Sequence, residues 1–259
     1  MLPMSVVIPC FNAEHTLARA LDSCVRQPEA AQIIVVDDGS CDGSAELVRR
    51  YAHQSPQIEL LPMPLNGGAA RARNWGAMHA AHPVLAFLDA DDEYLPGALG
   101  AAAAYLVEHP RQKSIRLDMD FDGFPAEIVS HPQFPELAAA LSNTVPSCLV
   151  IRRAVFAALG GFPLDDLFRR VGGEDGALAL ALLRLFGNPR LSDCKRVRMH
   201  YHRSIHAERF FRISMGMQAV TDEAIAAPRD ASLRFLERAR AAMRELRESG
   251  WDMEASGSH

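Results

Sequence analysis

Short apolar runs alternate with segments of helical periodicity through the first third of the chain. Apolar runs bounded by turn residues predict buried strands, and apolar positions spaced three or four apart predict helices. The predicted strands are Ser5–Pro9, Gln32–Val36, Ile58–Leu61 and Val84–Leu88, and the predicted helices are Ala13–Val25, Ser44–Ala52 and Asn66–His79, the last with Asn66 as its cap. Strands and helices that alternate at this spacing predict an α/β fold with a mostly parallel sheet flanked by helices.

Beyond Asp92 the alternation becomes irregular. We expect an Ala-rich helix over Leu95–Glu108, and Ser114–Val129 is assigned only broadly as strand and loop. The remaining predicted elements are a strand at Pro146–Arg152, a helix at Gly176–Phe186, an edge strand at Arg196–His202, and helices at Ala207–Ala226 and Ala231–Ser249. The sequence therefore predicts one main domain followed by a C-terminal helical tail.

A group of carboxylates ends the fourth predicted strand, in the sequence Asp89-Ala90-Asp91-Asp92. Three crowded carboxylates repel one another unless a positive group lies among them. A divalent cation such as Mn²⁺ or Mg²⁺ prefers oxygen ligands of this kind and often binds substrate phosphates as well. Aspartates in an isolated motif of this type also serve as caps of the following turn and helix. Residues elsewhere in the chain are therefore needed to distinguish a metal site from a capped turn.

Polar residues also follow the other three strands. Asn12 follows the first strand, Asp37-Asp38-Gly39-Ser40 the second and Asn66-Gly67-Gly68 the third. In open α/β sheets ligands bind at the carboxyl ends of the strands, and helix N-termini there bind phosphates. This edge therefore predicts a nucleotide-diphosphate pocket, although Asp37-Asp38-Gly39-Ser40 alone also fits a capped turn. Neither a GxGxxG fingerprint nor a Walker lysine motif is present, which disfavours dinucleotide and P-loop sites.

The composition excludes several other classes of protein. The 259 residues are 49% hydrophobic with a net charge of -5, which supports a folded core and disfavours a nucleic-acid partner. Five dispersed cysteines indicate reduced thiols, and no apolar stretch reaches the length of a signal peptide or membrane span. We expect a cytoplasmic protein, at most peripheral to the inner face of the membrane, without a transmembrane segment.

Taken in series, the motifs resemble those of the family 2 glycosyltransferases of the GT-A fold. The matching stretches are Val7–Asn12, Val35–Ser40 with Asp42, Asn66–Gly68 leading to Ala72–Gly76, Phe87–Asp92, Gly160–Phe162 and Glu174-Asp175. They occur in family order over about residues 4–205. The stretch between Asp92 and Pro146 matches no family motif, and it is in that part of the chain that the resemblance places acceptor specificity.

The resemblance implies a role for each matching residue. Those implied to bind the nucleotide sugar are Pro9, Phe11, Asn12, Asp38, Gly68, Arg73 and Asp89. Asp91 is implied to be the direct metal ligand, with His202 as the histidine that faces the metal or diphosphate. Asp175 is similar to the general base of the family, and Glu174 lies beside it and is expected to raise its pKa by repulsion.

Each of these residues also has a purely structural interpretation. Glu174 and Asp175 fit acids favoured at a helix N-terminus, and Arg73 fits a solvated helix face as well as it fits a diphosphate contact or a buried structural position. His202 is preferred to His200 and His206, although surface histidines are common. The C-terminal helix has arginines offset by glutamates, which favours packing or a homodimer contact over a membrane-surface face.

The sequence thus predicts a metal-dependent, inverting glycosyltransferase that acts in bacterial glycan biosynthesis. It would move a sugar from a nucleotide-diphosphate donor, a UDP-sugar, to a hydroxyl of a glycan, lipid-linked or protein acceptor. Two alternatives stay open: a non-catalytic sugar-nucleotide-binding module and a sugar nucleotidyltransferase. The predicted division is a glycosyltransferase domain at 1–205 (nucleotide-binding half 1–112, acceptor half 113–205), C-terminal helices at 206–250 and a disordered tail at 251–259.

Overall fold

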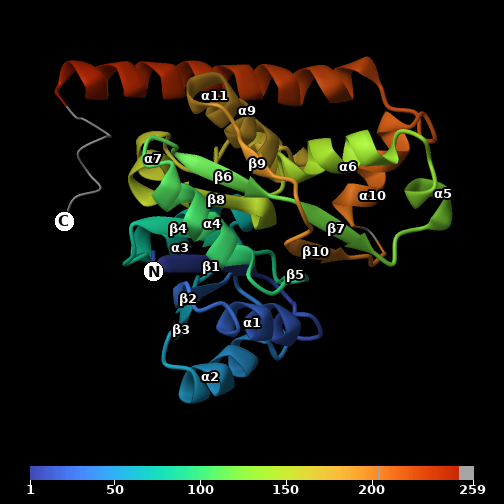
Figure 1. Cartoon of the computed structure of the whole chain (residues 1–259). Coiled ribbons are helices and arrows are strands. Elements are labelled where there is room, and N and C mark those ends of the chain that lie inside the picture. Colours follow the sequence, from blue (N-terminus) through green and yellow to red (C-terminus); the bar gives the residue numbers. More distant parts are fainter. Residues whose placement is uncertain (204, 251–259) are drawn as a thin grey trace.

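The computed structural model describes residues 1–203 and 205–250, and within them a central sheet lies between two layers of helices (Figure 1). In this part of the chain the central sheet has seven strands in the order β3-β2-β1-β4-β8-β6-β9. Their bounds are β1 Met4–Cys10, β2 Ala30–Asp37, β3 Ile58–Pro62, β4 Val84–Phe87, β6 Ser114–Leu117, β8 Leu149–Arg152 and β9 Arg190–Leu191. The predicted tail at 251–259 lies outside the described residues, and the division at residue 205 stays a prediction.

Strands β1 to β4 pair in parallel, so the predicted βαβ units of the first third of the chain are confirmed. The connecting helices are α1 Leu17–Val25, α2 Ser44–Gln54 and α3 Ala69–His79. Alternate strand residues face opposite layers, since Val6 packs in one apolar cluster with α1 whereas Val7 packs in the other with α3. Both faces of the sheet are therefore buried, as the continuous apolar strands predict.

The second half of the chain adds antiparallel pairing. Strands β8 and β6 continue the central sheet in antiparallel orientation, and a second sheet has the order β5-β10-β7. The strands of this second sheet are β5 Asp92–Tyr94, β7 Met119–Asp122 and β10 Val197–His200.

The prediction that Arg196–His202 forms an edge strand is wrong, because β10 is the middle strand of its sheet. The alternation of Arg198 and His200 with apolar residues suggests one face in water. Instead, Arg198 pairs with Asp120 at 2.8 Å, and His200 contacts Asp122 and Glu93 at 3.0 and 3.3 Å. Charged residues on both neighbouring strands pair with these side chains, so a polar pattern here marks a paired face rather than an edge.

The remaining helices cover the second half of the sheet and its ends. They are α4 Ala98–Glu108, α5 Ala126–Val129, α6 Phe134–Ser142, the 3-10 turn η1 Pro146–Cys148, α7 Arg153–Ala158, α8 Asp166–Val171, α9 Glu174–Phe186, α10 His206–Ser214 and α11 Asp222–Glu248. Among the described residues, no helix has both the length and the apolar character required to cross a bilayer.

Helix α11 differs from the predicted pair of helices, since it continues through Pro228 as one element across the molecule (Figure 1). A proline inside a helix costs about 3 kcal/mol. The apolar side of α11 buries Ala231, Phe235, Leu236 and Met243 in the cluster that also contains α9. Burial of large apolar side chains contributes about 1.5–3 kcal/mol each, which offsets the cost of the proline.

Candidate active site

A cavity of about 640 Å³ lies at the carboxyl ends of β1, β2 and β4. We call it the larger cavity. Every residue that the sequence analysis assigns to nucleotide or metal binding lines it, namely Pro9, Phe11, Asn12, Asp38, Gly68, Arg73, Asp89, Asp91 and His202. The structure thus brings together residues from widely separated parts of the chain, as required by the predicted pocket.

Asp38 joins the end of β2 to the loop that precedes α3. Its carboxylate is buried and accepts hydrogen bonds from the backbone N–H groups of Gly67 and Gly68, at 2.7 and 2.8 Å. Gly68 has φ 88° and ψ 158°, a backbone conformation that is essentially restricted to glycine. The predicted Asn66 cap is wrong: Gly68 precedes the helix without a side-chain cap, because the carboxylate of Asp38 already binds the backbone of this turn.

Asn12 and Phe11 form another wall of the larger cavity. Asn12 has φ 51°, a left-handed conformation that is uncommon for a residue other than glycine. Its side-chain oxygen accepts the N–H of Cys41 at 2.8 Å, and its own N–H donates to the hydroxyl of Ser40 at 3.0 Å. These bonds hold the turn in place and leave the ring of Phe11 half exposed at the cavity wall.

The three carboxylates that follow β4 have three different environments. Asp89 accepts a hydrogen bond from Arg73 at 2.6 Å. Asp92 is buried and bonded to the hydroxyl of Ser147 at 2.6 Å, and burial, followed by the charges of Asp91 and Asp89, raises its pKa well above the usual value. Asp91 and Asp89 both line the cavity with partly exposed carboxylates, but Asp89 is paired with Arg73 and Asp92 is buried, so the expected repulsion is relieved largely by the protein itself.

Asp91 and His202 form a contact suited to a metal. The Nε2 atom of His202 lies 2.9 Å from Oδ2 of Asp91, and its Nδ1 atom lies 3.0 Å from the backbone carbonyl of Arg203. A carbonyl only accepts hydrogen bonds, so Nδ1 donates to it. The carboxylate is also an acceptor, so Nε2 donates to Asp91 when no cation is bound, and the neutral ring with its hydrogen on Nδ1 would offer the Nε2 lone pair to a cation. This is the tautomer that a metal-ligating histidine requires. Of the three candidate histidines, His202 is the one that lines the larger cavity.

The donor set of this contact fits a divalent cation only in part. Among the described residues, no three His, Cys, Asp or Glu side chains are arranged to hold a metal by themselves. An imidazole nitrogen and a carboxylate oxygen suit Mn²⁺ or Mg²⁺ when oxygens of a bound diphosphate complete the coordination.

Arg73 lies between the larger cavity and the start of α9. It is buried, with Nη2 at 2.6 Å from Asp89, Nη1 at 3.3 Å from Glu174, and its guanidinium 5.3 Å from the ring centroid of Phe162. The interpretation of Arg73 as a residue of a solvated helix face is therefore wrong, because Asp89, Glu174 and the ring of Phe162 enclose it. No sequence motif indicates that one guanidinium joins Asp89 to Glu174.

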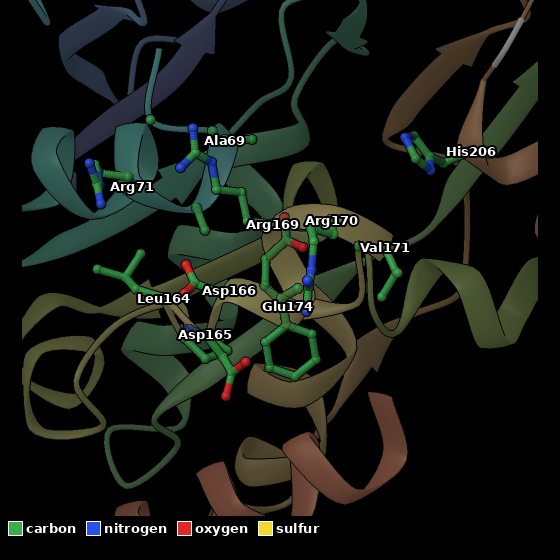
Figure 2. A pocket seen from close by; sticks show the side chains of 16 residues that line it. Ala69, Arg71, Leu164, Asp165, Asp166, Arg169, Arg170, Val171, Glu174 and His206 are labelled. Carbon is green, nitrogen blue, oxygen red and sulfur yellow. The ribbon is translucent and has the colours of Figure 1, made fainter. Parts of the chain in front are cut away.

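A second cavity of about 320 Å³, the smaller cavity, adjoins the first (Figure 2). Gly68 and Ala69 line both cavities, and Glu174 and His206 line the smaller one. Gly67, Ala70 and Arg71 of the loop and helix α3 also line it, and most of the remaining lining residues come from α8 and the turns on either side of it, including Leu164, Asp165, Asp166, Arg169, Arg170 and Val171. Sequence reasoning missed this whole segment, since no motif marks it.

Asp175 is partly buried in the first turn of α9 and lines neither cavity. Its Oδ1 accepts the N–H of Gly176 at 2.7 Å. Burial, followed by the charge of Glu174, raises the pKa of Asp175 to about 6. The charge of Glu174 thus raises the pKa of Asp175 as predicted, but burial raises it more.

Comparison with known proteins adds independent evidence. The sequence model of glycosyl transferase family 2 matches residues 5–159. Similar curated proteins include ExoU, a succinoglycan biosynthesis protein of Rhizobium meliloti, and EpsE of Bacillus subtilis. ExoU is 39% identical over 37% of this chain and 28% of its own length, and EpsE is 30% identical over 66% of this chain and 64% of its own length. The chain therefore spans less than two thirds of the length of these relatives.

Solved structures with the same fold include two glycosyltransferases. TarS of S. aureus in complex with UDP has a TM-score of 0.62 and 20% identity, with 91% of this chain and 70% of that chain covered. The mannosyltransferase PcManGT of Pyrobaculum calidifontis in complex with GDP-Man and Mn²⁺ also has a TM-score of 0.62, with 21% identity over 99% of this chain and 78% of that chain. The fold is GT-A, and the chain belongs to glycosyl transferase family 2.

Proposed function

We propose that this protein transfers a sugar from a nucleotide-diphosphate donor in the larger cavity to a hydroxyl of an acceptor in the smaller cavity. The observation that carries the proposal is the convergence of Asp38, Asp91 and His202, which are far apart in the sequence, on one cavity at the carboxyl edge of a parallel sheet. The neighbouring structures were solved with UDP, UDP-GlcNAc or GDP-Man, which supports a nucleotide sugar as donor. UDP is our expected nucleotide.

The larger cavity offers distinct contacts for each part of such a donor. The exposed ring of Phe11 can stack on the base, and the carboxylate of Asp38 lies where base or ribose groups would bind. The N-terminus of α3 follows Gly68, and its first-turn N–H groups have no partner within the helix. These groups, together with the positive end of the helix dipole, favour a bound diphosphate.

Asp91 and His202 are the residues that would hold a divalent cation in this site. When bound, Mn²⁺ or Mg²⁺ neutralises negative charge on the leaving diphosphate. The Mn²⁺ in the PcManGT complex supports the same use of metal here. Arg73 holds Asp89 at the cavity wall, where that carboxylate is available to hydroxyls of the ribose or donor sugar.

Asp175 is the proposed general base for an inverting displacement. It would take the proton of the acceptor hydroxyl while the acceptor oxygen attacks the anomeric carbon, and the bonding electrons of the broken C–O bond would leave with the nucleoside diphosphate. A base with a pKa near the working pH is suited to this step, and the pKa of Asp175 is about 6. Glu174 is less suited, because Arg73 binds its carboxylate.

Binding of nucleotides tests the proposal directly. Thermal unfolding in the presence of UDP, GDP, UDP-glucose or UDP-GlcNAc, with and without Mn²⁺, should show a shift for at least one nucleotide that increases with metal. Release of UDP from the matching donor should accompany it. If no nucleotide shifts the unfolding temperature at millimolar concentration, the proposal is wrong.

One observation favours a second candidate function, a non-catalytic sugar-nucleotide-binding module. Asp175 lines neither cavity, so an acceptor hydroxyl must reach it through a rearrangement at the start of α9. A binding module would bind UDP with metal yet release no UDP from any nucleotide sugar in the presence of acceptor mixtures.

A further inference from the structure

Three arginines lie around the smaller cavity. Arg71 comes from α3, and Arg169 and Arg170 come from α8, so two elements far apart in the sequence supply them (Figure 2). We call them the arginine cluster. Within the described residues none of the three forms an ion pair, and the only side-chain hydrogen bond in the cluster joins Arg169 to the carbonyl of Asn66 at 3.4 Å.

The acids of the same cavity form no ion pair with the cluster. The carboxylate of Asp165 accepts the N–H of Leu167 and caps α8. Glu174 is already paired with the buried Arg73. Only Asp166 remains as an acid without a partner among the described residues, against three arginines. Acids and arginines thus line the smaller cavity together, but the three guanidinium groups have no ion-pair partner among the described residues.

The cluster lies at the junction of the two cavities. The side chain of Arg71 packs so closely on Gly67 that a Cβ atom there would be 2.6 Å from its Cδ atom. On the neighbouring glycine, a Cβ atom at Gly68 would be 4.0 Å from Cγ of Arg169. The two arginine stems thus flank the glycine pair whose N–H groups bind Asp38, next to the place where donor and acceptor must meet.

We infer that the smaller cavity binds an acceptor with an anionic group, a phosphate or a carboxylate, which the arginine cluster recognises. Guanidinium groups bind both anions through paired N–H donors, and such charge-assisted bonds are stronger than neutral ones. This inference rests on the proposed function and adds to it the chemical class of the acceptor. A neutral sugar acceptor would form only the weaker hydrogen bonds between guanidinium N–H groups and hydroxyl oxygens.

Titration with small probes tests the inference. Isotope-labelled protein saturated with UDP and Mg²⁺, so that the larger cavity is filled, is titrated with sn-glycerol 3-phosphate or methyl glucuronide and, in parallel, with neutral glycerol or methyl glucoside. We expect the backbone amide signals of Gly67 and Gly68 to shift with at least one anionic probe and not with the neutral pair. The responsive anion then identifies phosphate or carboxylate as the recognised group. Equal shifts with neutral and anionic probes, or no shift with any probe, would overturn the inference.

Matched variants place the binding at the cluster. Arg71→Gln and Arg169→Gln should each weaken binding of the anionic probe by roughly tenfold or more, and added salt should weaken it further. Arg111→Gln is the control, because Arg111 is also exposed but lines neither cavity. Equal loss in all three variants would show a general charge effect and contradict a specific site.

The inference and the proposed function fail in different ways. UDP binding is measured separately from the probe titration, and the titration is also run without nucleotide. Protein that binds UDP but no anionic probe keeps the proposed function and loses the inference. Protein that fails to bind UDP loses the proposed function, while probe-induced shifts at Gly67 and Gly68 still decide whether the cluster binds anions.

Discussion

The larger and the smaller cavity meet at Gly68 and Ala69, yet their walls are built differently. In the larger cavity, Asp38 and Arg73 are buried, and each is fixed by two partners. In the smaller cavity, Arg170 and Leu164 are exposed, and the charged side chains of Arg71, Asp166 and Arg170 have no fixed partner among the described residues. Under the proposed function, the nucleotide would bind at the fixed site, and the acceptor would be met by side chains that still have freedom to adapt.

The largest expected effect is a loss of UDP release from the donor without a loss of UDP binding. Asp175→Asn removes the proposed base, so we expect UDP release from the donor to fall by about 10²–10⁴-fold while UDP binding is unchanged. For the wild type, kcat/KM should fall about tenfold per pH unit below pH 6, because protonated Asp175 cannot accept the proton. Steady-state assays over a pH series measure both.

Two variants control this measurement. Glu174→Gln should retain more activity than Asp175→Asn, and the exposed Asp230→Asn on α11 should retain all of it. Equal activity of Asp175→Asn and wild type would contradict the assignment of the base.

The next effect is a loss of stability when Arg73, which pairs with one carboxylate of each cavity, is replaced. Arg73→Met leaves Asp89 and Glu174 without the buried guanidinium that pairs with both. Removal of one partner of a buried ion pair costs about 3–5 kcal/mol, and we expect a loss near 3 kcal/mol because the carboxylates are partly exposed. Urea unfolding measures it.

Arg49→Met provides the matched control for Arg73→Met. Arg49 pairs with Glu46 at 3.4 Å, but both side chains are more than half exposed, so the expected loss is below about 0.5 kcal/mol. Similar losses in the two arginine variants would show that burial of Arg73 has no energetic consequence.

A smaller effect tests the metal site in the larger cavity. Asp91→Asn should reduce the gain in UDP affinity produced by Mn²⁺ by at least about tenfold, since even outer partners of metal ligands have effects of this size. UDP affinity in the presence of a chelator should stay unchanged. Calorimetric titration with and without Mn²⁺ measures both values, and an undiminished metal effect would exclude Asp91 as a ligand.

The smallest expected effect is a gain in stability. The pKa of Asp175 is about 6 in the fold against an ordinary 3.8, so the folded state disfavours the charged form and the wild type loses stability as pH rises through this interval. Asp175→Asn should therefore be more stable at pH 8 by about 1–3 kcal/mol, with a smaller gain at pH 5. Urea unfolding at the two pH values measures the difference. A gain independent of pH would show that the carboxyl is not held in a raised-pKa state.

Much of the fold and of the larger cavity could be predicted because both depend on local patterns. Val84–Phe87 is buried on both faces, and its apolar run ends where Asp89 begins the polar turn. Each strand of a parallel sheet places the residues after it at the same edge, so Asp38, Asp91 and Asn12 could be placed together from the sequence.

The smaller cavity could not be predicted, because no local pattern encodes it. Arg71 and Arg169 have the sequence context of ordinary surface arginines, and only the position of α8 against the loop before α3 brings them together. The middle position of β10 could not be predicted for the same reason. The polar residues of β10 pair with residues on strands that are distant in the sequence.

The order of residues along the chain establishes which side chains stand at the edge of the sheet, and folding establishes the environment of each. Three neighbouring carboxylates receive partners 16, 55 and 111 residues away: Arg73 for Asp89, Ser147 for Asp92 and His202 for Asp91. The charge and availability of a carboxylate depend on burial and on the groups within a few ångströms of it. Distances of this kind arise only when the chain is folded, and so adjacent aspartates with the same side chain acquire different properties.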